Sequence, residues 1–314
     1  MITGNYQSKK KVFAHTYSIV ARDPKTGEMG VGVQSHWFSV GSVVSWGEAG
    51  VGVVATQSLV NKSFGLRGLD LLKQGKTPKE AIEILLSDDE GRAVRQVAIL
   101  DTKGRIATHT GLKCIKQAGH IVGNNFSVQA NMMLSDQVWS AMAEAFEKHE
   151  NLPLPERIIR SLEGAESEGG DLRGKQSAAL LVVAGEAPNN KWEDPLIDLR
   201  VEDHTEPLKE INRLLKVWRA YEHMNNGDLA IEKGDMGKAL KEYNAAMEKF
   251  PDNLEMKYWT AVSLANNNKI NEAIDLFKNV FKKNKNWRLL TERLPEVELL
   301  NVKEDELKRI LSLK

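Results

Sequence analysis

Thr16 is the residue of this sequence that is best suited to act as a nucleophile. It opens the segment TYSIVARD, whose alternation is typical of a β-strand, and fifteen residues without a clear pattern precede it. A threonine hydroxyl attacks a carbonyl only when a base takes its proton, and the α-amine of the same residue, which titrates near pH ~8, is one such base. This chemistry requires removal of residues 1–15, so that Thr16 becomes the first residue. The alternative is structural, because threonine favours β-strands.

Neighbouring strand positions place further polar side chains near Thr16. Ser18 lies two residues along the same strand face, about 6–7 Å away, where it is able to contact a substrate. Ser35 and His36 end the next strand-like segment, beside the first. We predict both as catalytic, with His36 as a base or as the group that orients the base. The alternative for His36 is a hydrogen-bonded packing role.

Four amide side chains follow strand-like segments and are able to donate hydrogen bonds to a carbonyl oxygen. Gln57 ends an apolar strand and Asn61 follows it in a turn, where both also suit a turn cap. Gln129 and Asn131 are two residues apart and therefore share one face if the segment is extended. We predict that Asn131, or alternatively Asn61, holds the oxyanion of an acyl transition state, and that Gln57 and Gln129 contact substrate.

A glycine-rich loop, EGGDLRGKQS, comes directly before a strongly apolar segment. Its glycines let backbone N–H groups approach a ligand, and Arg173 is suited to bind a carboxylate through two hydrogen bonds. We therefore predict Asp171, Arg173 and Gln176 as substrate-binding residues. The alternative is that Asp171 and Arg173 clasp each other and stabilise the turn.

Neither a metal nor a cofactor is expected. His36, His120, Asp203 and His204 are the candidate metal ligands, yet no pair among them has a diagnostic ligand spacing. The sequence also contains no phosphate-loop or dinucleotide-binding glycine motif. We predict that the reaction uses groups of the protein without a cofactor.

The elements that must position these residues belong to two regions with different periodicity. Before about residue 207, strand-like runs alternate with pairs of amphipathic segments, and Thr77, Pro78 and Glu80 predict a capped helix start. The order of strands, two helices, strands, two helices and strands predicts an α+β sandwich of four layers, with two sheets inside and helices outside. The predicted strands cover residues 16–23, 30–37, 39–46, 49–57, 95–101, 105–111, 176–185 and 192–204, and the predicted helices cover 63–75, 77–89, 136–149 and 154–167.

The remainder, residues 208–314, is predicted to be an all-α domain of helical-hairpin repeats. Tyr243 recurs as Phe277 after 34 residues, and the flanking small residues keep the same spacing. This period, with Gly227 before Tyr243, is typical of tetratricopeptide-like repeats. We expect Tyr243 and Phe277 to be buried between helices and the region to bind a protein partner. Plain amphipathic helices are the alternative.

Composition limits the classes of partner and location. The chain has 314 residues, 41% of them hydrophobic, with 43 basic and 43 acidic side chains, so its net charge gives no attraction to nucleic acid. No apolar run reaches the roughly 18 residues that span a bilayer. Cys114 is the only cysteine, so no intrachain disulfide can form. We expect a cytoplasmic protein, with secretion as the alternative if the given start truncates a signal peptide.

Several ordered motifs carry a resemblance to a known family. Residues 16–215 resemble the family catalogued as domain of unknown function 1028. The resemblance implies a fold similar to the N-terminal-nucleophile hydrolases, in which two antiparallel sheets lie between helix pairs, and it makes Thr16 the matching nucleophile position. The motifs are TYSIVARDPKTGEMGVGVQSHWFSVG, AGVGVVATQ, GLRGLDLL, GGDLRGKQSAALLVV and LIDLRVEDH.

Together these observations predict three segments and one activity. Residues 1–15 are a leader that is removed or disordered, 16–207 form the hydrolase-like domain, and 208–314 form the helical tail. We expect an amidohydrolase that acts on a small amide, an N-acyl or ureido compound, or a short peptide. The alternative is a hydrolase-shaped binding module without catalysis, and a homodimer is left open.

Overall fold

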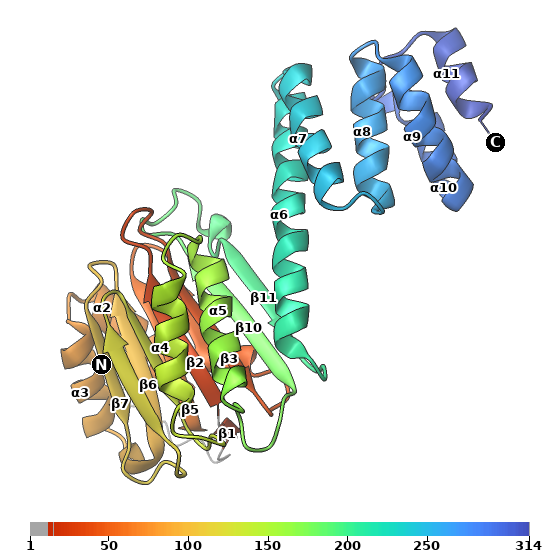
Figure 1. The fold of residues 1–314 in the computed structure, drawn as a ribbon. Coiled ribbons are helices and arrows are strands. Elements are labelled where there is room, and N and C mark those ends of the chain that lie inside the picture. The colour runs from red at the N-terminus through yellow and green to blue at the C-terminus, as the bar shows by residue number, and fades with distance from the viewer. Residues whose placement is uncertain (1–11, 15, 314) are drawn as a thin grey trace. The chain divides into compact units, whose positions relative to one another are not determined.

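A computed structural model describes residues 12–14 and 16–313, which form two compact units (Figure 1). The first unit ends at Arg213 and the second begins at Leu214, inside helix α6 (Pro207–Glu232). The sequence prediction placed this boundary between residues 207 and 208. Of the predicted leader, residues 1–11 and 15 lie outside the described residues, while Val12–Ala14 form strand β1.

The first unit is built on two antiparallel sheets. In the first sheet the order is β1-β5-β6-β7, and β4 also pairs with β5. In the second sheet the order is β11-β10-β3-β2-β9-β8. The bounds are β2 Thr16–Arg22, β3 Met29–Ser35, β4 Ser45–Glu48, β5 Gly52–Val60, β6 Arg95–Asp101, β7 Ile106–Thr110, β8 Gly119–Gly123, β9 Phe126–Ala130, β10 Ser177–Val183 and β11 Ile197–Val201.

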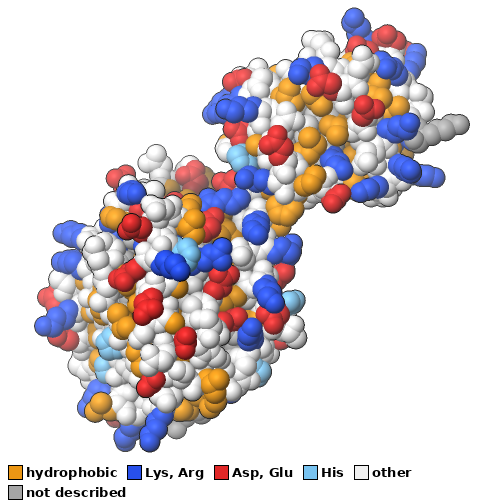
Figure 2. Space-filling model, in the orientation of Figure 1, with side chains coloured by type: hydrophobic (Ala, Val, Ile, Leu, Met, Phe, Trp, Pro, Cys, Tyr) orange, Lys and Arg blue, Asp and Glu red, His pale blue; other side chains and the backbone are white. Residues whose placement is uncertain are grey.

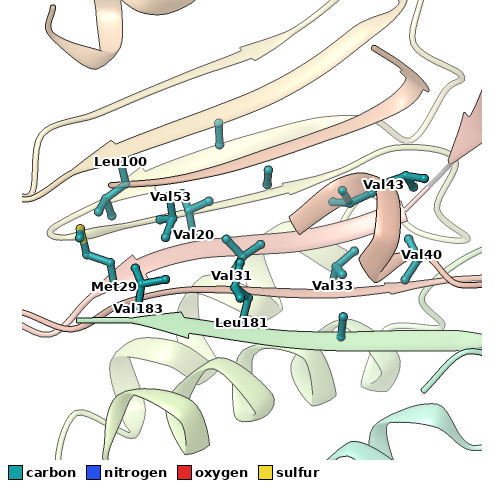
Figure 3. Close-up of a cluster of buried hydrophobic side chains, with 14 of the residues drawn as sticks. Val20, Met29, Val31, Val33, Val40, Val43, Val53, Leu100, Leu181 and Val183 are labelled. Carbon is teal, nitrogen blue, oxygen red and sulfur yellow. The ribbon is translucent and has the colours of Figure 1, made fainter. Parts of the chain in front are cut away.

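A cluster of small and branched side chains fills the space between the sheets (Figure 3). Val20, Val31 and Leu181 come from the second sheet, and Val53 and Leu100 come from the first. Because successive side chains alternate across a strand, the placement of Val20 puts Ser18 and Thr16 on the same inward face of β2. The position of the site therefore follows from the alternation of one strand.

Helices cover the outward faces of both sheets. Helices α2 (Ser63–Lys73) and α3 (Pro78–Ser87) pack on the first sheet, and α4 (Val138–Lys148) and α5 (Leu154–Ser167) pack on the second. Helix α5 lies so close to β3 that a Cβ added at Gly32 would come within 2.3 Å of Ile158 Cγ2. The predicted start of α3 is confirmed by a capping box between Thr77 and Glu80.

Two elements differ from the sequence prediction. The predicted strand over residues 39–46 instead begins with the short helix α1 (Gly41–Val44), because the buried Val40, Val43 and Val44 follow a helical spacing. The hairpin of β8 and β9 is absent from the predicted strands, since the exposed His120 and Val122 leave β8 without an inward apolar pattern.

The second unit consists of helices. After α6 come α7 (Met236–Lys249), α8 (Leu254–Asn266), α9 (Ile270–Lys283), α10 (Asn286–Arg293) and α11 (Glu304–Leu311). The predicted burial of Tyr243 and Phe277 is confirmed, and each side chain is 0% exposed. A Cβ added at Gly227 would lie 2.5 Å from the Tyr243 ring, which explains the small residue there.

Within the described ranges, no helix has the length and apolar character that crossing a membrane requires. On the face shown in Figure 2, acidic and basic side chains are interspersed in both units.

Candidate functional site

The backbone of Thr16 is held by three hydrogen bonds that converge on its carbonyl oxygen. Gln57 Nε2 donates at 3.2 Å, the Asn131 backbone N–H at 3.1 Å and Asn131 Nδ2 at 3.3 Å. Thr16 is 0% exposed, and among the residues that the structure describes its Oγ1 has no hydrogen-bond partner. The main chain is thus fixed while the hydroxyl is left without a protein partner, an uncommon state for a buried polar group.

Gln96 of β6 is the centre of the polar network around Thr16. Its Oε1 accepts from Gln57 Nε2 at 2.7 Å and from Asn131 Nδ2 at 2.9 Å. Its Nε2 donates to Thr110 Oγ1 and to the carbonyl oxygens of Gly119 and Ala130. The side chain therefore joins both sheets and orients the two amides that hold Thr16. Sequence reasoning missed it, and the only signal was a glutamine inside the apolar segment RQVAILD.

Ser18 is held between two glutamine side chains. Its Oγ donates to Gln57 Oε1 and accepts from Gln129 Nε2, both at 2.6 Å. Ser127 Oγ in turn donates to Gln129 Oε1 at 3.2 Å. All four residues are 0% exposed, so Ser18, Gln57 and Gln129 line the interior beneath Thr16 in this structure. Their predicted contacts with a substrate stay a prediction.

Ser35 is the residue directly opposite Thr16. The two are Cα partners in the pairing of β2 with β3, which places their Cβ atoms about 4.5–5.5 Å apart on one face. Ser177 pairs with Ser35 from the other side, so three buried hydroxyl residues lie in a row across the sheet. Ser177 Oγ is engaged locally, since it accepts from Val40 N at 3.1 Å and donates to the Trp37 carbonyl.

His36 lies just past the end of β3 and is exposed. Its backbone N–H donates to Asp171 Oδ2 at 3.0 Å, which connects the strand end to the glycine-rich loop. No described contact joins the His36 ring to Thr16. Its predicted role as a base or orienting group therefore stays a prediction.

The glycine-rich loop contains the clasp that the sequence left open as an alternative. Arg173 Nε donates to Asp171 Oδ1 at 3.0 Å, and Arg173 Nη2 donates to Asp171 Oδ2 at 2.7 Å. The Asp171 side chain is 0% exposed and that of Arg173 is 28% exposed. Gln176 Nε2 donates to Asp203 Oδ1 at 3.1 Å. These contacts order the loop, and the predicted substrate role of the three residues stays untested.

Asn61 and Asn131 differ as candidate oxyanion donors. Asn61 Oδ1 accepts from Ser63 N and Ser63 Oγ, so Asn61 serves the turn before α2. Asn131 lies against Thr16, but its Nδ2 already donates to Thr16 O and to Gln96 Oε1. Of the two, only Asn131 is at the site, and serving an oxyanion requires its amide to exchange one of these partners.

The backbone next to two of these amides adopts an unfavourable conformation. Ser58 follows Gln57 with φ of 70°, and Met132 follows Asn131 with φ of 60°. Such left-handed conformations in non-glycine residues cost about 1–3 kcal/mol, and they persist where the surroundings impose them. The strain at both amides that hold Thr16 indicates that their placement is maintained against a local cost.

A surface cavity of about 710 Å³ adjoins the network at the edge of the second sheet. Thr110 and His120 line it, and His120 Nδ1 lies 2.9 Å from Thr110 Oγ1. Desolvation and the neighbouring His109 lower the pKa of His120. Cys114 also lines the cavity, and burial raises the pKa of its thiol. A hydrogen-bonded chain thus runs from this cavity through Thr110 to Gln96.

Metal ligands do not cluster in residues 12–14 and 16–313, where no group of three or more histidine, cysteine or acidic side chains suits an ion.

Gln34 is a further residue that sequence reasoning missed. It is 0% exposed, and within the described chain neither polar atom of its side chain has a partner.

Comparisons with known proteins concern mainly the first unit. Residues 16–211 match the model of a family described as a family of unknown function, DUF1028. The crystal structure of a DUF1028 protein from Silicibacter pomeroyi is similar, with 31% sequence identity and a TM-score of 0.58. The similarity covers 65% of this chain and 85% of that chain. A comparison with curated proteins finds no match.

Proposed function

The chain belongs to DUF1028, a family of unknown function, and from this premise we propose that it is an amide-bond hydrolase with Thr16 as its nucleophile. The proposal includes a fold like that of the N-terminal-nucleophile hydrolases and the removal of residues 1–15. The family match begins at Thr16, which supports this residue as the start of the functional unit.

One observation supports the proposal most strongly: hydrogen bonds fix the main chain of Thr16, while its hydroxyl has no hydrogen-bond partner among the described residues. Three N–H donors hold its carbonyl, whereas its Oγ1 has no partner within the described residues. A nucleophile needs this combination, because its position must be fixed while its oxygen stays available to a base and a carbonyl.

The reaction needs only Thr16, the amide substrate and water. The α-amine takes the proton of the hydroxyl as Oγ1 bonds to the carbonyl carbon. Collapse of the tetrahedral intermediate breaks the C–N bond, and the ammonium returns the proton to the leaving amine. Water then hydrolyses the ester, which yields the carboxylic acid and restores the hydroxyl. Gln57, Asn131 and Gln96 act here as positioning residues, and Ser35 is the nearest hydroxyl able to contact the intermediate.

The proposal extends to the helical tail as a tetratricopeptide-like region that binds a protein partner. The 34-residue recurrence of Tyr243 and Phe277 and the burial of both rings support it. We place the protein in the cytoplasm, with a small amide or a short peptide as substrate.

Two measurements test the activity. The intact mass of the protein from its native host should show loss of residues 1–15. A chain that begins at Thr16 should hydrolyse at least one member of an amide and peptide library. Thr16→Ala should then lower the rate by about 10³-fold or more, while Thr16→Ser keeps part of it. Equal turnover by the wild type and Thr16→Ala would refute the nucleophile.

A binding module without catalysis is the second candidate. The hydrogen bonds within the site favour this candidate, because the polar side-chain atoms already bond to one another. The residues are Ser18, Gln57, Gln96 and Gln129. This candidate predicts no turnover from any library member and a partner that copurifies through residues 214–314.

A further inference from the structure

Strand β1 joins the leader to the first sheet immediately before Thr16. It runs antiparallel to β5, with Val12 opposite Val60, Phe13 opposite Leu59 and Ala14 opposite Ser58. The chain then passes to the second sheet, where Thr16 opens β2. Residues 12–14 of the leader therefore lie along one edge of β5, two residues before Thr16 in the chain.

Strand β1 covers that edge of β5 at residues 58–60 by pairing with it. Strand β4 pairs with β5 only from Gly52 to Ala55, and β6 pairs with it only up to Ser58. In the described part of the chain, β1 is thus the one strand that pairs with Leu59 and Val60. An uncovered strand edge is a template that binds an extended peptide through backbone hydrogen bonds.

The register of β1 on β5 fixes how many residues separate this pairing from Thr16. Ala14 pairs with Ser58, and a single residue separates Ala14 from Thr16. In a peptide that lies where β1 lies, the residue after the one that pairs with Ser58 is the one whose carbonyl Thr16 would attack. By covalent connection, that carbonyl in the leader is bonded to the nitrogen of Thr16 itself.

We propose that β1 occupies the substrate groove, and that the substrate is a peptide whose acyl side adds as a strand to Ser58–Val60 of β5. This inference rests on the proposed function and selects the peptide from its substrate classes. The leader is then both the cover of the groove and the first occupant of it, and its removal opens the edge beside the nucleophile.

The contacts of β5 also predict which backbone groups of the peptide matter. Arg95 of β6 donates through Nη1 to the Leu59 carbonyl, which therefore points toward β6. Because neighbouring peptide groups of an extended strand point in opposite directions, the Ser58 carbonyl and both the N–H and the carbonyl of Val60 point toward β1, whereas the left-handed Ser58 leaves the direction of its own N–H outside this rule. The amides at the positions of Val12 and Ala14 should bond to β5, whereas the amide at the position of Phe13 should face away.

The test uses the leaderless protein and a fluorescent peptide of sequence Lys-Val-Phe-Ala-His. The protein is released after folding from an N-terminal fusion, so that Thr16 comes first. The leaderless protein starts where the family match starts, and it keeps every residue of the described core clusters of the first unit. Peptides N-methylated at alanine or at phenylalanine are matched controls, because both carry one added methyl group. Full-length protein is the control for an occupied edge.

Three results are expected. The leaderless protein binds the peptide at least about tenfold more tightly than the full chain does. Methylation at alanine weakens binding about tenfold or more, and methylation at phenylalanine leaves it within about twofold. Hydrogen exchange at Val60 is slow in the full chain, fast in the leaderless protein and slow again with peptide.

The inference is overturned if exchange at Val60 is the same with and without the leader. It is also overturned if both methylated peptides bind equally well, or if the peptide protects another surface, such as the cavity at His120. If the leaderless protein does not fold, the full chain with Ala14→Pro should show faster exchange at this amide, and Phe13→Pro should not. Equal exchange in the two variants overturns the inference.

The outcome is separable from that of the proposed function. Leaderless Thr16→Ala should bind the peptide as the wild type does. Edge binding without Thr16-dependent turnover would refute the hydrolase and leave this groove standing. Thr16-dependent turnover of a substrate that leaves exchange at Val60 unchanged would refute only the groove.

Discussion

Replacement of Gln96 by leucine should be among the most destabilising single changes in the first unit. The two side chains are similar in size, so little volume changes and the effect is one of hydrogen bonding. Gln96 is 0% exposed and takes part in five hydrogen bonds, two through Oε1 and three through Nε2. Leucine removes all five and leaves their partners buried.

The magnitude follows from the partners that remain. A buried group left without its hydrogen bond costs about 1–3 kcal/mol. Gln57 Nε2 keeps the Thr16 and Gln129 carbonyls, and Asn131 Nδ2 keeps the Thr16 carbonyl, so these donors fall at the low end. The Gly119 and Ala130 carbonyls also lose one donor each, and at the lower part of about 0.5–1.5 kcal/mol for each of the five bonds the loss sums to about 3–5 kcal/mol in the free energy of unfolding.

Gln34→Leu is the matched control. It makes the same substitution at another fully buried strand position, but among the described residues Gln34 has no hydrogen-bond partner to lose. We expect Gln34→Leu to be neutral or stabilising, because replacing an unsatisfied amide by an apolar group of similar shape removes a desolvation cost. Denaturant unfolding of the full chain, followed by circular dichroism in the β-sheet region, measures both variants.

Comparison of Gln96→Leu with Gln34→Leu tests whether the hydrogen-bond network, and not the burial of an amide alone, stabilises the first unit. Gln96→Leu should lower the unfolding temperature of the first unit by roughly 10 °C, at about 2–4 °C per kcal/mol for a unit of this size. Equal effects of the two variants would refute the view that the network around Thr16, rather than burial of an amide as such, stabilises this region.

Three further predictions concern other parts of the molecule. Tyr243→Ala should destabilise the second unit by about 3–5 kcal/mol, because it empties a fully buried site; amide exchange should quicken in α7 and α8 but not in β6. Gly32→Ala should cost about 1–3 kcal/mol through the clash with Ile158 Cγ2, and it should cost less in an Ile158→Ala background, which lacks that atom, in a double-mutant cycle by chemical unfolding. Partial desolvation and the neighbouring His109 lower the pKa of His120, so the unfolded chain binds this proton first, and stability should fall as the pH drops below about 6.5; His120→Gln should show a smaller drop in unfolding temperature between pH 7.5 and pH 5.

Local chemistry was enough to predict many elements from the sequence. The apolar stripe of residues 154–167 predicted α5 with its observed bounds, and the spacing of Thr77 and Glu80 predicted the capped start of α3. The 34-residue recurrence predicted that Tyr243 and Phe277 are buried. Each of these features depends on residues in one helix or in one repeated pattern, and the periodicity of the chain records such features directly.

The partners of Thr16 were decided only by the tertiary structure. Ser35 opposes Thr16 because of the register of β2 on β3, and Gln96 reaches both sheets because of the way the sheets stack. A shift of one residue in either strand would turn these side chains to the opposite face. Registers between distant strands are set by the packing of the whole core, which no local pattern encodes. The sequence by itself therefore determined that Thr16 opens a core strand, and the tertiary structure decided which groups surround it.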